Sequence, residues 1–245
     1  MSRPASFATA VAAQARIEAR LTARRGENLL AMVGIPAAAL LFFGTVGIGG
    51  VARGIDELVP PSISLALVAS GLVNLGIATA YERGYGVLKR LGGAPLGRAG
   101  LLVAKLAVVT AVGIAQIMAL LVLAAILGWR LPVAASLPAL VVVAAVAISA
   151  FAGLGLLLAG TLRQEGTLLL ANILFLIAIL FGGIVAPIDA LPGALGGLAA
   201  ILPSGAATNG IRAALEGGDV ASPLAVLLAW AIGAVAIASR TFRWE

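Results

Sequence analysis

Long apolar runs separated by short polar segments are the feature that most limits what this chain can fold into. A helix needs about 20 apolar residues to cross the roughly 30 Å hydrocarbon layer of a membrane. Runs of about that length recur along the sequence, and nearly all charged residues lie outside them. We therefore predict an all-α integral membrane protein with six transmembrane helices, at about residues 29–51, 62–81, 100–127, 137–160, 167–186 and 224–239.

The composition supports a lipid environment and narrows the possible chemistry. Hydrophobic residues make up 62% of the 245 residues and charged residues 11%, whereas a soluble domain carries about 25% charged residues. The chain contains no Cys and no His, which removes disulfides, thiolate and imidazole metal ligands, and the commonest general base. Any enzyme activity would therefore depend on carboxylate, Ser or Lys chemistry.

The distribution of basic residues predicts the orientation. Six crossings place both termini on one side of the membrane. All but three of the 16 basic residues then lie on that side, the exceptions being Arg53, Arg130 and Arg212. Cytoplasmic segments carry the excess of Lys and Arg, so we predict a multi-pass protein with both termini in the cytoplasm.

Residues 1–28 form the longest polar stretch and have an amphipathic pattern. On a helix, Phe7, Val11, Ile17 and Leu21 share one side, and Arg16, Arg20 and Arg24 the other. Glu18 and Arg25 interrupt the apolar side. We predict a cytoplasmic interfacial helix that contacts membrane lipids; the alternative is a solvated leader.

The centres of the predicted spans carry no charged residue. Ion-coupled carriers and charged-ring channels use ionisable groups at that depth, so their absence argues against both classes. Asn74, Thr79, Gln116 and Asn172 are polar residues within the spans. They either line a passage or form hydrogen bonds between helices.

A transporter without such groups needs another source of energy, but the chain has no phosphate-binding loop. The segment 155–161 has the glycine spacing, yet it lacks the Lys and lies within a predicted span. We therefore expect no cofactor and no ATP site in this chain. ATP and Mg would be bound by a partner subunit.

The connection after the second span predicts a short amphipathic helix on the cytoplasmic side, ended by Gly92, Gly93 and Pro95. Leu88 and Leu91 would offer apolar contacts to a cytoplasmic partner. Charged contacts would come from Arg83, Lys89 and Arg90. An ordinary positively charged loop is the alternative.

A segment rich in Pro and Gly follows the fifth span. Residues 195–202 are apolar but too short to cross the membrane. We predict short re-entrant helices between spans five and six, with a plain extracellular loop as the alternative. The residues that characterise this segment are Gly183, Pro187, Leu191, Pro192, Pro203 and Arg212.

Both segments resemble those of ABC type-2 transporter permeases. In the first, the matching residues are Glu82, Arg83, Gly86, Leu88, Arg90, Leu91, Pro95, Leu96 and Arg98. Gly84 and Val87 depart from the family pattern, which often has an acidic residue and Thr there. In the second, Gly183, Pro187, Leu191 and Pro192 match, followed by Pro203 and Arg212. The resemblance implies that Glu82, Arg83, Gly86, Leu88, Lys89, Arg90 and Leu91 form a coupling helix that contacts the ATPase.

The resemblance also implies a function. Such permeases export drugs, lipids or glycolipids from bacteria, and the daunorubicin-resistance efflux branch is the most similar. We therefore expect a subunit of the bacterial cytoplasmic (inner) membrane. Its partners would be a nucleotide-binding ATPase subunit and a second permease, in a homodimer or a heterodimer, and no nucleic acid.

Two other classes stay open on the residues alone. An integral-membrane lipid-modifying enzyme or assembly factor would need paired carboxylates, and Asp56 and Glu57 are the only adjacent acidic pair. A secondary carrier is the other class, which the uncharged spans disfavour.

Overall fold

The computed structural model describes residues 6–24, 26–46, 54–92 and 96–241, and within these ranges the chain is helical without strands. In chain order the elements are α1 (Phe7–Arg24), α2 (Gly26–Thr45), α3 (Ile55–Val68), the π-helix η1 (Ala69–Asn74), α4 (Leu75–Gly84), α5 (Val87–Gly92), α6 (Gly97–Ile126), α7 (Leu137–Thr161), α8 (Gln164–Phe181), the 3-10 turn η2 (Ile188–Ala190), α9 (Ala194–Ile201), α10 (Pro203–Glu216) and α11 (Ala221–Thr241). The predicted all-α membrane class is confirmed.

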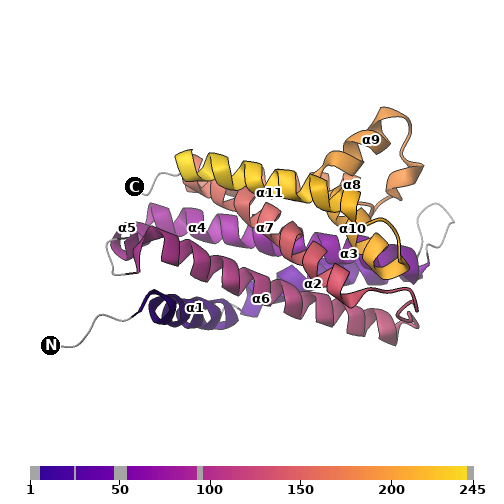
Figure 1. Cartoon of the computed structure of the whole chain (residues 1–245), viewed down its shortest axis with the longest axis horizontal. Helices are drawn as coiled ribbons and strands as arrows, with labels where there is room; N and C mark the ends of the chain where they lie inside the picture. Colours follow the sequence, from indigo (N-terminus) through magenta and orange to yellow (C-terminus); the bar gives the residue numbers. More distant parts are fainter. Residues whose placement is uncertain (1–5, 25, 47–53, 93–95, 242–245) are drawn as a thin grey trace.

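The long helices run side by side along the longest axis of the molecule (Figure 1). Helices α1 and α5 and the C-terminal end of α11 lie at one end of the bundle, and α9 lies toward the other. Among the described residues, five helices are long and apolar enough to cross a membrane: Ile55–Gly84, Ala99–Ile126, Leu137–Thr161, Gln164–Phe181 and Ala221–Thr241. The first predicted span corresponds to α2, whose apolar part, Met32–Thr45, is shorter. Residues 47–51 of that span lie outside the described residues.

The helix formed by α3, η1 and α4 is the centre of the bundle. Of its apolar window 78% is buried inside the chain, against 17% for α8 and for α11. Its serines are buried as well, and the Ser64 hydroxyl donates a hydrogen bond of 2.9 Å to the carbonyl of Ser204 in α10. A helix buried on all sides needs such partners for its polar groups.

The start of this helix differs from the prediction. Asp56, Glu57, Pro60 and Pro61 lie between the predicted spans 29–51 and 62–81, where a connecting loop is expected. The structure includes all four in α3, which begins at Ile55. The acidic residues lie in the first turn, where their negative charge interacts favourably with the positive end of the helix dipole. Both prolines are buried by neighbouring helices.

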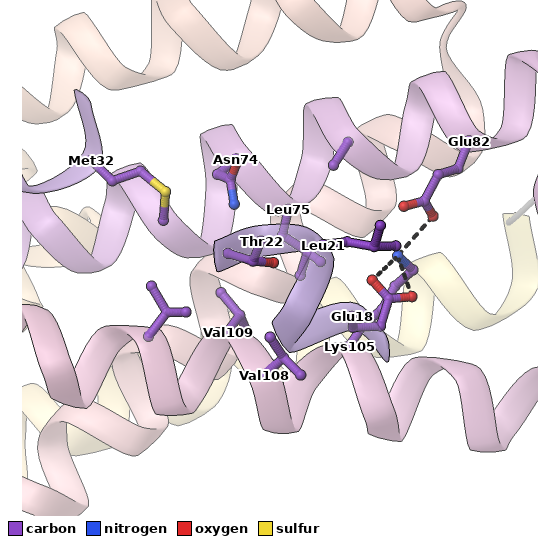
Figure 2. Close-up of a pocket in the computed structure, with 12 residues that line it drawn as sticks. Glu18, Leu21, Thr22, Met32, Asn74, Leu75, Glu82, Lys105, Val108 and Val109 are labelled. Atoms are coloured by element: carbon purple, nitrogen blue, oxygen red, sulfur yellow. Dashed lines mark hydrogen bonds and ion pairs between the residues drawn. The ribbon is translucent and has the colours of Figure 1, made fainter. Parts of the chain in front are cut away.

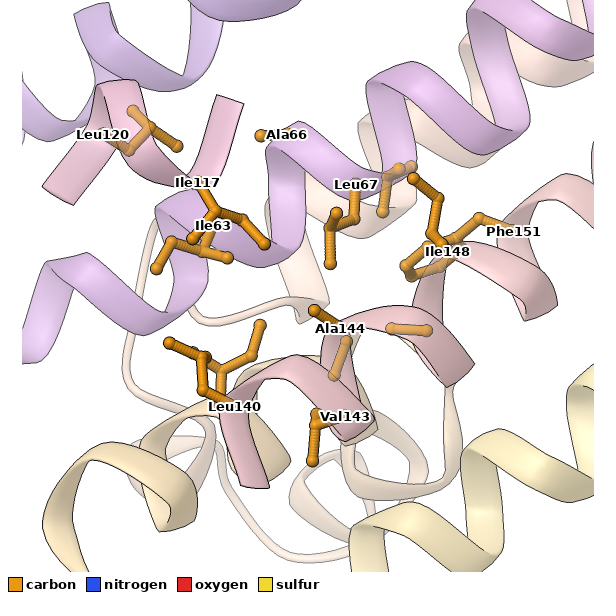
Figure 3. Packing of buried hydrophobic residues seen from close by; sticks show 14 of the residues in the cluster. Ile63, Ala66, Leu67, Ile117, Leu120, Leu140, Val143, Ala144, Ile148 and Phe151 are labelled. Atoms are coloured by element: carbon orange, nitrogen blue, oxygen red, sulfur yellow. The ribbon is translucent and has the colours of Figure 1, made fainter. Parts of the chain in front are cut away.

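The core lies where α3, α6 and α7 meet, as Figure 3 shows. Ile63 and Leu67 from α3 pack there with Leu120 from α6 and with Ile148 and Phe151 from α7. All five side chains are almost completely buried. This apolar layer fixes the position of α3 relative to the helices that surround it.

Glycines allow the backbones of the central helix and α7 to touch. A Cβ atom on Gly155 would lie 2.7 Å from the carbonyl oxygen of Gly71 and 3.2 Å from the amide nitrogen of Gly76. Gly153 in α7 allows a second close approach, because its Cβ position lies 3.0 Å from the Cβ of Ala234 in α11. Close approach of this kind is a common way for helices to pack in membranes.

Candidate functional site

The segment from Glu82 to Gly92, which we call the α4–α5 arm, turns sharply between its two helices. Gly86 has a φ of +70°, a left-handed conformation that glycine adopts without strain. The amides of Tyr85 and Gly86 donate hydrogen bonds of 2.9 Å to the carbonyls of Tyr81 and Arg83. This arrangement ends α4 and starts α5 in a new direction, so the predicted short helix after the second span is present.

The exposed side of α5 differs from the predicted one. Leu88, expected to contact a partner, is only 1% exposed and packs inside its own chain. Tyr85 is 69% exposed and Val87 38%, while Lys89 and Arg90 are exposed. The side chain of Leu91 lies outside the described residues. The short helix therefore uses Leu88 as its anchor and presents an aromatic, an aliphatic and two basic side chains outward.

The arm is braced against the turn between α7 and α8. The guanidinium of Arg83 donates a hydrogen bond to the carbonyl of Leu162, the residue that follows α7. Gly84 lies against the side chain of Gln164, so that a Cβ atom there would collide with the amide oxygen. A hydrogen bond from a charged donor is stronger than one between neutral groups, and this one ties the arm to the turn between α7 and α8.

A buried ion cluster lies beside the arm, and Figure 2 shows its three side chains pointing toward one another. The ammonium of Lys105, in α6, lies 2.7 Å from Oε2 of Glu82 in the arm. It also lies 3.2 Å from Oε1 of Glu18 in α1 and donates a hydrogen bond of 3.3 Å to Oε2 of the same residue. The Lys105 side chain is 3% exposed, Glu18 13% and Glu82 20%.

The contact of Lys105 with Glu82 is an ion pair without an aligned hydrogen bond, and Oε2 of Glu82 has no hydrogen-bond donor in the described part of the chain. A small polar cavity of about 50 Å³ adjoins the cluster, lined among others by Thr22 and Asn74. Removing an ammonium from water costs several kcal/mol unless it is paired. The two carboxylates supply that pairing for Lys105.

An apolar groove of about 690 Å³ runs between α2, the central helix and α8. Its walls include Ile35, Ile77 and Phe175, and its few polar groups include Asn74 and Asn172. The amide of Asn172 donates a hydrogen bond of 2.7 Å to the carbonyl of Leu168 one turn earlier. Asn172 is exposed and lines the groove, and this bond occupies its amide nitrogen.

The π-helix η1 forms part of the groove wall. It spans Ala69–Asn74 and ends on the polar residue that lines both the groove and the small cavity. A π-helix widens the helical turn and is frequent at functional sites. It changes which side chains face the groove relative to a regular α-helix.

Two of the predicted passage residues lie away from the groove. Gln116 is 2% exposed, contacts the Ser70 hydroxyl through its oxygen, and donates a hydrogen bond of 3.1 Å to the carbonyl of Met32. Thr79 is 1% exposed, and its hydroxyl has no hydrogen-bond partner within the described residues. The structure therefore brings Asn74 and Asn172 together and separates Gln116 and Thr79 from them.

The segment after α8 forms short helices, as its prolines and glycines predict. Gly183 has a φ of +88°, Pro187 precedes η2, and Leu191 follows it. Pro192 lies in the turn before α9, and Pro203 is the first residue of α10. Arg212 and Asp189 line a polar pocket of about 460 Å³ there. Helix α10 is buried along most of its length, so this segment is part of the bundle.

The ion cluster is the part of the site that the sequence analysis missed. In the sequence, Glu18 interrupts an apolar helix face, and Lys105 lies inside the predicted span 100–127. Each was in an unexpected place, and they are 87 residues apart. The two anomalies explain each other, because a charge buried by one helix needs an opposite charge from another.

Comparison with known proteins identifies the family. The profile of the family described as ABC-2 type transporter matches residues 9–215, which contain the arm, the ion cluster and nearly all of α10. None of the curated proteins compared matches the chain. A match over most of the 245 residues, on a bundle of membrane-length helices, confirms the resemblance seen in the sequence. The chain thus belongs to the ABC-2 type transporter family, as a multi-pass membrane subunit of an ABC transporter.

Proposed function

We propose that this chain is the permease subunit of an ATP-driven exporter and that a separate ATPase subunit docks on the α4–α5 arm. The observation that carries the proposal is the arm itself, in which buried Leu88 anchors α5 and Tyr85, Val87 and Arg90 face outward. Members of the family normally work with an ATPase subunit. An exposed surface with basic and aromatic side chains suits an acidic groove on such a partner.

The proposed topology has six crossings, with α2 as the first and both termini in the cytoplasm. The excess of basic residues at the end that holds α1 and α5 supports this orientation. In this orientation α1 lies at the cytoplasmic surface, with its arginines toward anionic headgroups and α5 on the same side. Helices α9 and α10 then re-enter from the outer side.

The groove between α2, the central helix and α8 is the proposed path of the exported compound. Its apolar walls and few amides suit a hydrophobic or amphipathic molecule, such as a drug, lipid or glycolipid of the kind handled by the daunorubicin-resistance branch. The groove is open on one side, so a second permease is needed to enclose the path. A copy of this chain or a related subunit would serve.

Buried Lys105 modifies one argument against a secondary carrier. A charged residue does lie inside a membrane-length helix, but it lies eight residues after the start of α6, roughly 12 Å along the axis. Its partner Glu82 lies two residues before the end of α4. The cluster therefore belongs to the end of the bundle that holds the arm, where charged side chains are least costly.

The docking proposal is tested by co-purification with the candidate ATPase. The charge reversal Arg90→Glu, combined with Tyr85→Ala, should abolish co-purification and transport. The matched control is Arg130→Glu, an exposed arginine outside the arm, which should leave both intact. ATP hydrolysis by the purified chain alone, or full transport by the double variant, would contradict the proposal.

The path is tested by substitutions in the groove. Asn74→Leu and Asn172→Leu should change the range of compounds transported while the ATPase still co-purifies. Ser149→Ala is the control, because the Ser149 hydroxyl bonds only the carbonyl of Ala145 in its own helix. Transport that stops with a protonophore but persists after ATP depletion would instead support a secondary carrier.

A further inference from the structure

Lys105 is the only charged residue among the described side chains that is buried, and its ammonium is shared by three helices. Glu18 comes from α1, Glu82 from the α4–α5 arm, and Lys105 from α6 (Figure 2). Such a cluster is expensive to bury and costly to break. Its presence at the end of the bundle therefore calls for an explanation beyond packing.

Helix α1 lies along the outside of the bundle. None of its residues is buried, and it packs mainly on α6 and, less extensively, on α2. The ammonium of Lys105 contacts a carboxylate of α1 and a carboxylate of the arm, and so joins the two elements. Without it, α1 would keep its half-buried packing on α6, but this ionic connection to the arm would be lost.

Glu82 also connects the cluster to the groove. It lines the groove and the small cavity, as Asn74 does. A shift of the Glu82 carboxylate by the 1–2 Å typical of helix movements would lengthen the 2.7 Å ion pair to as much as about 4.7 Å, beyond direct contact. Movement of the arm, of α1 or of the groove wall beside Glu82 therefore affects α1, α4 and α6 together.

We infer that Lys105 is a positioning residue that joins α1 to the α4–α5 arm, so that the N-terminal helix and the arm move as one body with α6. This inference rests on the proposed function, in which the arm receives the stroke of the ATPase. It adds that α1 takes part in transmission and does not serve only as a membrane anchor. Substituting the lysine should release α1 from the arm.

The charge balance supplies the test. The cluster has two carboxylates for one ammonium, so Lys105→Met leaves two largely buried carboxylates without their cation and should lower the apparent melting temperature by about 10 °C. The triple variant Glu18→Gln, Glu82→Gln, Lys105→Met removes all three charges at similar volume and should melt near the wild type. Stability and linkage are thereby separated.

Linkage is measured on the chain alone, which has no cysteine to interfere with labelling. Spin labels at Ala13→Cys and Arg90→Cys, both exposed positions, report the distance between α1 and α5 in nanodiscs of phosphatidylethanolamine and phosphatidylglycerol. The triple variant should broaden or shift the distance distribution by at least about 2 Å. The control Glu165→Gln, an exposed carboxylate on α8, should leave it unchanged.

The functional arm uses the complex with the ATPase. Lys105→Arg, which keeps the charge, should retain transport, whereas the stable triple variant should bind the ATPase but transport poorly. An unchanged spin-label distance in the triple variant overturns the inference, as does wild-type transport by it. The distance measurement needs no ATPase, so it decides the linkage even if the proposed function fails.

Discussion

The contact between Gly155 and the central helix makes a quantitative prediction for Gly155→Ala. A Cβ atom at this position would lie 2.7 Å from the carbonyl oxygen of Gly71 and 2.9 Å from that of Leu72. Ordinary contacts begin at 3.4 Å, so the backbones must separate by about 0.5–0.7 Å, because no side chain can rotate away. A gap of that size forfeits a quarter to a half of the dispersion energy of each contact it opens.

The expected cost of this separation is about 1–3 kcal/mol, the range for an added methyl group in a packed core. At about 2–4 °C per kcal/mol for a chain of this size, the apparent melting temperature should fall by about 2–12 °C. Tryptophan fluorescence during heating in detergent measures the change.

Gly233→Ala is the matched control, because Gly233 lies in the helix α11 and nothing lies within 4 Å of its Cβ position. Its expected effect has the opposite sign, since alanine stabilises a helix relative to glycine by about 0.5–1 kcal/mol. If Gly155→Ala melted with or above the wild type, the described contact of α7 with η1 would be wrong.

Three further predictions follow from individual contacts. Gln116→Leu leaves the carbonyl of Met32 without its donor. The free energy of unfolding, measured by chemical denaturation, should fall by about 0.6–1.7 kcal/mol, from the average to the maximum found for hydrogen bonds between membrane helices. Thr110→Ala is the control, because the Thr110 hydroxyl bonds a carbonyl of its own helix. Trp230→Phe removes the 2.8 Å hydrogen bond to the carbonyl of Ile201 and should raise hydrogen exchange in α9 several-fold, while α6 stays protected. Gly86→Val forces a bulky residue into the left-handed conformation, at a cost of about 1–3 kcal/mol. The substitution should expose position 88, so a cysteine placed there should be labelled faster. Equal labelling rates with and without Gly86→Val would count against the described turn.

Much of the bundle follows from the sequence, because apolar length is a local property. The helices at 137–161 and 221–241 lie within about three residues of their predicted bounds. The fifth ends at Phe181 instead of residue 186, since Gly183 takes a left-handed conformation soon after it. The second helix begins before Pro60 and Pro61 instead of after them. The neighbouring helices that bury both prolines cannot be read from the local sequence pattern.

The positions of the side chains in the candidate site could be predicted less well from the sequence. The short helix at 87–92 was predicted, but its inward residue was not. A two-turn helix has too few positions to decide whether Leu88 faces a partner or its own chain. The ion cluster joins residues 18, 82 and 105 through space. The π-helix leaves no mark in composition, and it ends on Asn74, which lines the groove.

The burial of the central helix has a consequence for how the protein is made. Its Ser64 hydroxyl depends on the carbonyl of Ser204, 140 residues later in the chain. At about 5–20 residues per second, a ribosome needs roughly 7–28 s to synthesise that partner. During this interval the helix formed by α3, η1 and α4 is already at the membrane, but α10, which carries the acceptor of the Ser64 hydrogen bond, has not yet been made. Until α10 has emerged, the Ser64 hydroxyl must be satisfied elsewhere, by a carbonyl of its own helix or by a polar group of the insertion machinery.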